Sequence, residues 1–255
     1  MLGAIIGDIV GSVYEFNNTF DYNFPLFSDK GSYTDDTICT IAVADALVKG
    51  ISYQDSLIKW CRKYPSPMGS YGGSFSMWLW SKDPKPYGSY GNGSAMRVSP
   101  VSWAFNNYHI MADKALKTAL PTHNHPEGLQ GALAIASAIW LGRFNASDSE
   151  IENFGNLYYP GFMRKLYRKG EFDETCMVTV PLAFKILLES SSFEDSIRKA
   201  ISHGGDSDTL GAIVGSMAES KFGIPKNIRD KALIYLPAEM LDVINAFKQK
   251  FGYNG

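Results

Sequence analysis

Three glycines near the N-terminus, Gly3, Gly7 and Gly11, recur every four residues. Residues four apart lie on the same face of an α-helix, so this spacing predicts a helix with one face free of side chains. Each glycine lowers helix stability by about 1 kcal/mol relative to alanine. We therefore expect another backbone to pack very close against this face; a glycine-rich loop is the alternative.

The helical spacing of apolar residues continues along most of the chain. From Asp36, the run DTICTIAVADALVKG is amphipathic and ends at Gly50. We expect further helices over residues 53–64, 103–119, 127–143, 175–189 and 193–202, from Asp208 onward, and once or twice within 226–250. Alternation of polar and apolar residues, which would indicate strands, is scarce. The sequence therefore predicts an all-α fold with residues 1–255 in a single compact domain.

Two segments lack this spacing. Residues 17–32 are polar and aromatic and are predicted to form a loop or flap. Residues 65–100 are rich in Gly, Pro, Ser and Tyr, and long loops are rare in compact domains unless they serve a function. Low-complexity disorder is the alternative, but four residues are predicted to anchor the segment in the core: Trp78, Trp80, Met96 and Val98.

The formal net charge of −2 gives no electrostatic reason to expect nucleic acid or an anionic membrane as a partner. Three widely spaced cysteines suit a reducing compartment and are expected to be buried thiols. The apolar N-terminus lacks a basic region and is interrupted by Asp8, and no run approaches the roughly 18 apolar residues of a spanning helix. We expect a cytoplasmic protein, with a monomer favoured.

Two acidic clusters each stand at the start of a predicted helix. The first, Thr34-Asp35-Asp36, is compatible with simple helix capping, because acids near a helix start favour the helix dipole. The second, Asp206-Ser-Asp208-Thr209, follows two glycines that allow a tight turn. Two carboxylates and a threonine there exceed what one cap requires.

Both clusters combine carboxylates with a threonine hydroxyl, and hard divalent cations such as Mg²⁺ prefer oxygen ligands of this kind. Four carboxylates brought together would repel one another without cations between them. If the clusters meet in the fold, a pair of metal ions is the natural consequence. Glu15 is a third candidate, for which an ordinary exposed glutamate is the alternative.

The loop from Gly88 to Arg97 offers backbone N–H groups, hydroxyls, an aromatic ring and a guanidinium group, which together can cradle a diphosphate and stack a base. It matches neither the dinucleotide fingerprint nor the P-loop. His123 and His125 form a His-x-His pair, but no third His or Cys lies nearby to complete a zinc site. Contact of an imidazole with substrate is the favoured interpretation.

Five motifs now stand in order along the chain: GDIVGSVYE (7–15), YTDDT (33–37), GSYGNGSAMRVSP (88–100), THNHPEG (122–128) and GGDSDTLGAIVGS (204–216). This series resembles the ADP-ribosylglycohydrolase family, which includes the dinitrogenase reductase-activating glycohydrolases. The resemblance implies an all-α fold with two divalent cations, Mg²⁺ or Mn²⁺. It also implies hydrolysis of the glycosidic bond between ADP-ribose and an acceptor, commonly a protein side chain.

The resemblance assigns roles to individual residues. The implied metal ligands are Thr34, Asp35, Asp36, Asp206, Asp208 and Thr209. Glu15, on a mobile flap, would be a further ligand or the acid/base, a role also open to Asp35 and Asp36. The implied substrate-binding residues are Gly88, Ser89, Tyr90, Gly91, Asn92, Gly93, Ser94, Met96, Arg97 and His123, with Tyr90 near the adenine.

The sequence departs from the family pattern at Ser207, where threonine is frequent and where no ligand is expected. The chain is also short for the family, so loops that shape the choice of acceptor are expected to be missing. The linkage therefore stays open between arginine, serine and non-protein acceptors. Two alternatives are a hydrolase of small ADP-ribosyl compounds or nucleotide glycosides and a catalytically silent homologue that binds ADP-ribose.

Overall fold

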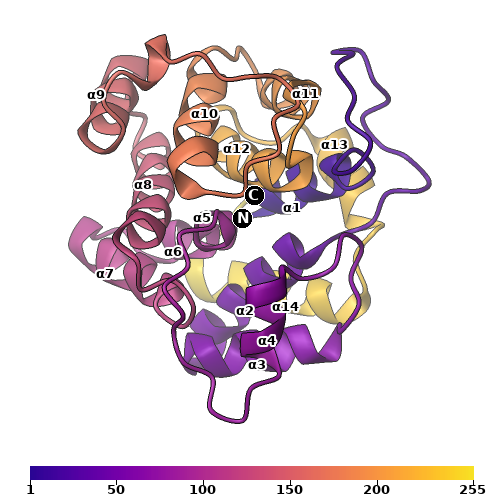
Figure 1. Cartoon of the computed structure of the whole chain (residues 1–255), viewed down its shortest axis with the longest axis vertical. Coiled ribbons are helices and arrows are strands. Elements are labelled where there is room, and N and C mark those ends of the chain that lie inside the picture. The colour runs from indigo at the N-terminus through magenta and orange to yellow at the C-terminus, as the bar shows by residue number, and fades with distance from the viewer.

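The structure, a computed structural model, describes all 255 residues. It consists of helices and loops without an extended strand, which confirms the all-α prediction (Figure 1). The elements are α1 (Leu2–Gly11), α2 (Asp35–Lys49), α3 (Tyr53–Lys63), α4 (Gly73–Leu79), α5 (Gly93–Met96), α6 (Ser99–Ala104), α7 (Tyr108–Ala119), α8 (Pro126–Arg143), α9 (Asp148–Tyr158), the 3₁₀ helix η1 (Phe162–Arg164), α10 (Cys176–Leu188), α11 (Phe193–His203), α12 (Ser207–Phe222), α13 (Lys226–Leu233) and α14 (Ala238–Phe251).

Helices α1 and α12 pack backbone against backbone at the centre of the molecule (Figure 1). A Cβ atom built on Gly7 would lie 1.9 Å from the carbonyl oxygen of Gly211, and one on Gly3 would lie 2.1 Å from that of Gly215. On Gly11 it would lie 2.5 Å from the Cα of Asp208. The predicted close approach is confirmed. The alternative interpretation, in which these three glycines belong to a loop, is wrong. This contact brings the start of α12 to the end of α1.

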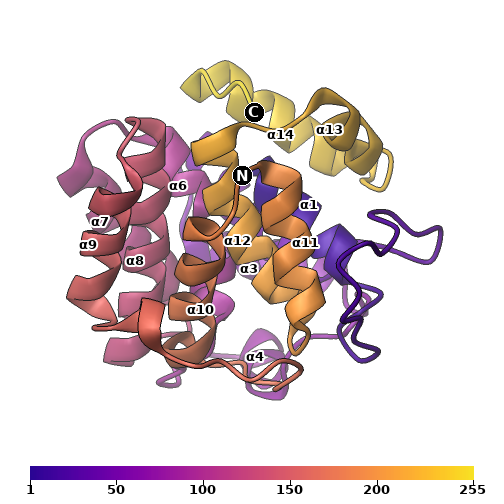
Figure 2. The ribbon, with the colours of Figure 1, turned by 90° about the horizontal axis from the view of Figure 1, so that it is seen from above.

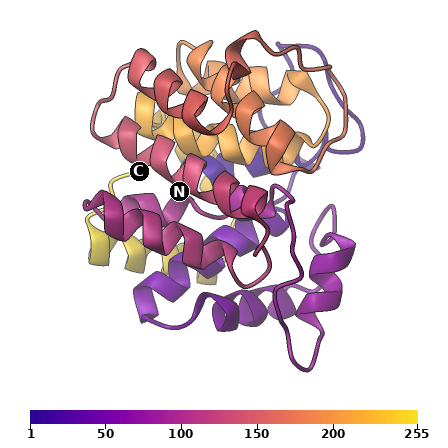
Figure 3. The same ribbon diagram turned by 60° about the vertical axis from the view of Figure 1, so that its left-hand side comes forward.

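The other helices surround this pair. Helices α7, α8 and α9 form one side of the molecule, and α13 and α14 cover another face, which is at the top of Figure 2. Figure 3 shows the helices of residues 175–222 in one tier and those of residues 35–79 in the other. A single cluster of 58 buried residues runs through both tiers, so the helices share one hydrophobic core. The active-site candidates lie between the two tiers.

Several predicted element boundaries need correction. The helix predicted over 103–119 is split, because α6 ends at Ala104 and Asn107 caps a new helix that begins at Tyr108. Helix α9 was missed although Ser147 and Glu150 form a capping box at its start. Short helices α4 and α5 occupy parts of the segment 65–100.

The predicted anchors of segment 65–100 are mostly buried. Trp78, Met96 and Val98 are buried, but Trp80 is 57% exposed, so the prediction was wrong for Trp80. Its indole ring lies 5.3 Å from the guanidinium group of Arg62, which covers one face of the ring at the surface. All three cysteines are free and buried, as expected. None of the helices combines the length and apolar character needed to span a lipid bilayer.

Candidate active site

The two acidic clusters meet in the fold. The hydroxyl of Thr209 donates a hydrogen bond to Oδ2 of Asp36 at 3.0 Å, although 173 residues separate them in the sequence. Thr34 is the N-cap of α2, and its hydroxyl accepts from the N–H of Asp36. Asp206 is the N-cap of α12, but its side chain makes no capping hydrogen bond. Capping therefore accounts for part of the first cluster and leaves the carboxylates of the second cluster unexplained.

Three carboxylates form the buried centre of this junction. Asp8, Asp36 and Asp208 each present an oxygen within 4.8 Å of the others, and none is more than 3% exposed. Oδ1 of Asp36 and Oδ1 of Asp208 have no hydrogen-bond partner in the protein. Burying unpaired carboxylate oxygens is unfavourable unless a proton or a cation compensates their charge. The donor set therefore fits divalent cations, which prefer carboxylate oxygens.

The pKa values of these three carboxyl groups reflect their burial and their mutual repulsion. Burial, followed by the negative charges of neighbouring carboxylates, raises the pKa of Asp36 and of Asp208 well above its ordinary value. Burial likewise raises the pKa of Asp8 to about 6, against the effect of hydrogen bonds from Thr37 and Thr34. No lysine or arginine forms an ion pair with any of the three. A bound cation would supply the compensating positive charge.

Asp8 is a residue of the centre that sequence reasoning missed. Its carboxylate accepts four hydrogen bonds, from the N–H and hydroxyl of Thr34 and from the N–H and hydroxyl of Thr37. These bonds fasten the first turn of α2, which carries Asp35 and Asp36, to α1. The available signal was a single acid inside an otherwise apolar glycine-faced helix, which we interpreted only as an interruption of that run.

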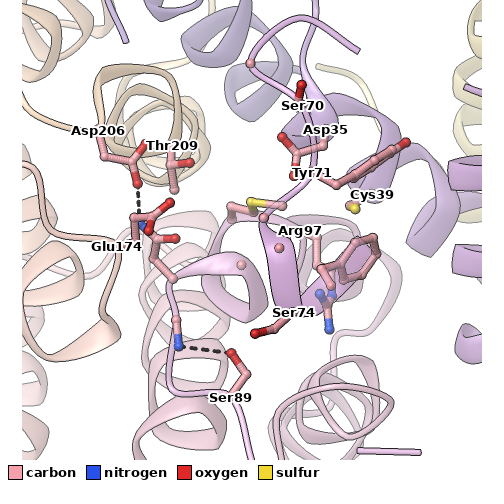
Figure 4. Close-up of a pocket in the computed structure, with 18 of the residues that line it drawn as sticks. Asp35, Cys39, Ser70, Tyr71, Ser74, Ser89, Arg97, Glu174, Asp206 and Thr209 are labelled. Carbon is pink, nitrogen blue, oxygen red and sulfur yellow. Dashed lines mark hydrogen bonds between the residues drawn. The ribbon is translucent and has the colours of Figure 1, made fainter. Parts of the chain in front are cut away.

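Above the centre lies a cavity of about 500 Å³. Asp35, Asp206, Asp208 and Thr209 line it, whereas Thr34 and Asp36 are buried and do not line it. Figure 4 shows Asp206 and Thr209 on one side and Asp35 on the other, with Glu174 beside Asp206. The first and second clusters thus approach the same cavity from opposite walls.

Glu15 also lines this cavity, from the segment that follows α1. Burial, and then the negative charges of Asp206 and Asp8, raise the pKa of its half-buried carboxyl to about 7. The carboxyl group lies against Gly69, where a Cβ atom would come within 2.5 Å of Oε2. A carboxyl group with this pKa can both hold and release a proton near neutral pH.

The loop from Gly88 to Arg97, named here the glycine-rich loop, forms the opposite end of the cavity. Of the predicted substrate residues, those that line it are Gly88, Ser89, Tyr90, Gly91, Asn92, Gly93, Met96, Arg97 and His123. Asn92 joins the loop to the acidic centre, since its amide donates to Oδ2 of Asp206 at 2.7 Å. Tyr90 is 48% exposed at the rim, edge-to-face with His125 at 5.3 Å. Ser94 is buried away from the cavity and donates to the carbonyl oxygen of Gly128 at 2.6 Å.

Aromatic residues that sequence reasoning did not single out complete the wall: Phe16, Tyr71, Phe75, Tyr87 and Phe172. Two of them, Phe16 and Phe172, stack with ring centroids 6.0 Å apart near Glu15 and Glu174. The crowding of Gly, Tyr and Ser in segment 65–100 was the only available signal for Tyr71 and Tyr87. The cavity therefore combines an acidic end, a glycine-rich loop and aromatic walls.

Comparisons with known proteins identify similar sequences and a similar fold. A sequence profile of the family described as ADP-ribosylglycohydrolase matches residues 1–242. The ADP-ribosylarginine hydrolase Tri1 of Pseudomonas putida is 24% identical, over 88% of this chain and 70% of that protein. The ADP-ribosylhydrolase ARH3 of Homo sapiens is 25% identical, over 88% of this chain and 84% of that protein. A solved structure described as an ADP-ribosylglycohydrolase-related protein complex has a TM-score of 0.76 and 23% identity, over 98% of this chain and 96% of that chain.

Proposed function

Because this chain belongs to the ADP-ribosylglycohydrolase family, we propose that it hydrolyses the glycosidic bond between ADP-ribose and an acceptor, most often a protein side chain, with two bound divalent cations. The observation that carries this proposal is the junction of two acidic clusters below one cavity. The hydrogen bond between Thr209 and Asp36 joins the clusters. The glycine-rich loop reaches the same junction through Asn92 and Asp206.

The unpartnered oxygens of Asp36 and Asp208 support cation binding at this centre. Its proposed ligands are Thr34, Asp35, Asp36, Asp206, Asp208 and Thr209, with Mg²⁺ or Mn²⁺ as the ions. When bound, such cations supply Lewis acidity, orient sugar hydroxyls and lower the pKa of a coordinated water. Asp8 holds the first turn of α2 through Thr34 and Thr37 and so keeps the ligands in register.

The other end of the cavity suits an ADP group. Ser89, Gly91 and Asn92 donate their backbone N–H groups within the protein, which leaves those of Gly88, Tyr90 and Gly93 for a diphosphate. Tyr90 also offers a partly exposed ring for the adenine. This orientation places the second ribose at the acidic end. Breaking its glycosidic bond builds positive charge on the sugar, which the surrounding carboxylates stabilise.

Glu15 is the proposed proton carrier. Its carboxyl group lines the cavity beside the acidic centre, where it can protonate a leaving acceptor or remove a proton from the attacking water. Asp35 lines the same cavity and is the other candidate for this role, while Asp36 is buried and does not line it.

A panel of substrates tests the proposal. Arginine-linked and serine-linked ADP-ribose, each on protein and as a small conjugate, are incubated with the full chain at defined Mg²⁺ and Mn²⁺ concentrations. Release of ADP-ribose from at least one conjugate, abolished reversibly by EDTA, is the expected result. Release of ADP-ribose from small conjugates alone would restrict the function to the small-molecule alternative. Binding of ADP-ribose without turnover of any conjugate would identify a catalytically silent homologue and reject the proposal.

A further inference from the structure

A row of three buried side chains leads from the end of α7 to the cavity. Arg97 is 1% exposed, and its Nη2 donates to the carbonyl oxygen of Thr118 at 3.0 Å and to Oγ1 of Thr122 at 2.8 Å. Oγ1 of Thr122 lies 2.6 Å from Nδ1 of His123. His123 is 3% exposed and lines the cavity, so the row ends at the substrate site.

The hydrogen bonds of this row determine where the proton on His123 lies. A guanidinium group only donates, so the hydroxyl oxygen of Thr122 must accept from Arg97. The hydroxyl hydrogen of Thr122, which is fully buried, then has one available acceptor, Nδ1 of His123. If Nδ1 carried the proton instead, that hydroxyl hydrogen would be buried without a partner, at a cost of roughly 1–3 kcal/mol. The neutral ring therefore carries its proton on Nε2.

Nε2 of His123 has no hydrogen-bond partner in the protein. The carbonyl oxygen of Gly91 lies near the ring and accepts a hydrogen bond from the thiol of Cys176 at 3.0 Å, but its geometry does not make a hydrogen bond with Nε2. The ring is held in place from behind, because a Cβ atom on Gly128 would come within 3.0 Å of it. Positions for Cβ atoms on Gly91 and Gly93 lie 3.9 Å and 3.8 Å from Nε2, so the ring supports the glycine-rich loop.

We propose that Thr122 is a positioning residue, which fixes His123 in the Nε2–H form so that the ring donates a hydrogen bond to an acceptor oxygen of the substrate. This inference rests on the proposed function for the identity of the substrate, whose diphosphate supplies such oxygens next to the glycine-rich loop. Arg97 orients Thr122 in this arrangement, with Nη2 directed to Thr122 and to the carbonyl end of α7.

The electrostatics of the site agree with a neutral donor. Burial, and then the positive charge of Arg97, lower the pKa of His123 well below its ordinary value, against a weaker opposite effect of the Gly91 carbonyl. The ring is therefore uncharged at pH 7. It contributes a directed N–H group, while Arg97 contributes the positive charge of this end of the cavity.

The tautomer is measured directly by two-bond ¹H–¹⁵N correlation spectra of the full chain labelled on histidine. The chain has four histidines, and the spectrum of His123→Gln identifies the signals of His123. We expect a protonated Nε2 and an unprotonated Nδ1 in the unsubstituted protein and in Thr122→Ser, which keeps the hydroxyl. In Thr122→Val the form protonated on Nδ1 is expected to become populated. A ring protonated on Nδ1 in the unsubstituted protein would overturn the inference.

Binding of ADP-ribose, measured by calorimetry, tests the consequence for recognition. Loss of one directed hydrogen bond to an anionic oxygen should weaken binding to Thr122→Val by at least about tenfold, while Thr122→Ser stays within about threefold. Equal affinity and an unchanged tautomer in Thr122→Val would overturn the positioning role. If Thr122→Val does not fold, the tautomer of His123 in the unsubstituted protein and in Thr122→Ser decides whether the inference holds. A failure of the unsubstituted protein to bind ADP-ribose would reject the proposed function instead, since the tautomer is measured without ligand.

Discussion

The hydroxyl of Thr209 lies 3.0 Å from Oδ2 of Asp36, and this bond joins the first turn of α12 to the first turn of α2. The bond satisfies one oxygen of Asp36 and leaves the other, Oδ1, buried without a partner. The fold therefore assembles the junction, but protein groups do not fully compensate the negative charge of its buried carboxylates. Protein groups alone place the oxygens, and a proton or a cation must compensate their charge.

Removing one carboxylate from the centre should separate catalysis from stability. We predict that Asp36→Asn and Asp208→Asn each lower hydrolysis by at least about a hundredfold. Both variants should be at least as stable as the unsubstituted protein without metal, because repulsion between buried carboxylates falls. The rise in Tm that Mg²⁺ gives the unsubstituted protein should disappear. Release of ADP-ribose and thermal melts with and without Mg²⁺ measure these effects.

The matched control is Asp242→Asn, an exposed carboxylate on α14 that should change neither activity nor the effect of Mg²⁺. Treatment of the unsubstituted protein with EDTA should abolish hydrolysis, and added Mg²⁺ or Mn²⁺ should restore it. Full activity in the metal-stripped protein would contradict the cation centre.

The close contact between α1 and α12 should tolerate no side chain. Gly7→Ala would place a methyl group 1.9 Å from the carbonyl oxygen of Gly211, so the helices must separate. We predict a loss of about 3 kcal/mol or more in the free energy of unfolding and a loss of activity, because α12 carries Asp208. Gly73→Ala, at an open position in the first turn of α4, should leave the free energy of unfolding nearly unchanged. Equal stability of the two variants in urea titrations would show that the helices adjust freely.

The glycine pattern of α1 is the part of the fold that could be predicted most directly from the sequence. Gly3, Gly7 and Gly11 required a close backbone, and α12 carries small residues with the same spacing at Gly211 and Gly215. The helical spacing of apolar residues also predicted most of the other helices. Helix α9 was not predicted because it begins in a polar segment. Its capping box was a stronger signal there than the spacing of apolar residues.

The candidate site could be predicted only where a residue's chemistry is visible in its type and spacing. The carboxylates of both clusters met that condition, but Asp8 did not, because its role depends on α1 lying beside the first turn of α2. Ser94, for which the motif suggested a substrate contact, does not line the cavity, and its hydroxyl donates to the carbonyl oxygen of Gly128. Local sequence does not reveal which side of a loop faces a cavity.

Replacement of Asp8 should affect both folding and metal binding. The carboxylate of Asp8 now accepts four hydrogen bonds from Thr34 and Thr37. In Asp8→Asn, the NH₂ group of the side chain would face some of these donors and could not accept their hydrogen bonds. We predict that the free energy of unfolding falls by about 3 kcal/mol and that the affinity for Mg²⁺ falls roughly 10- to 100-fold. Urea titration and calorimetry with Mg²⁺ measure the two effects. Thr37→Ser, which keeps the hydroxyl, is the control and should retain most of the free energy of unfolding and most of the Mg²⁺ affinity. Unchanged Mg²⁺ affinity in Asp8→Asn would refute the role of Asp8 in ordering the ligands.

Asp195 provides a pH test of the segment that carries Glu15. Burial acts to raise the pKa of Asp195, but hydrogen bonds from Lys199, Ser191 and Tyr22 outweigh it and lower the pKa to about 2 from an ordinary value of 3.8. The Tyr22 hydroxyl, in the segment between α1 and α2, donates to Oδ1 at 2.7 Å. A lowered folded-state pKa stabilises the protein above about pH 4, and this contribution is lost as the pH falls toward 2.

We predict that Asp195→Asn lowers the free energy of unfolding by about 2 kcal/mol at pH 7. The difference in this free energy between the two proteins should shrink steadily below pH 4, as measured by urea titration at each pH. A constant difference for Asp195→Asn between pH 7 and pH 2.5 would mean that Asp195 contributes through its shape alone, because only the ionised carboxylate makes the bonds that lower its pKa.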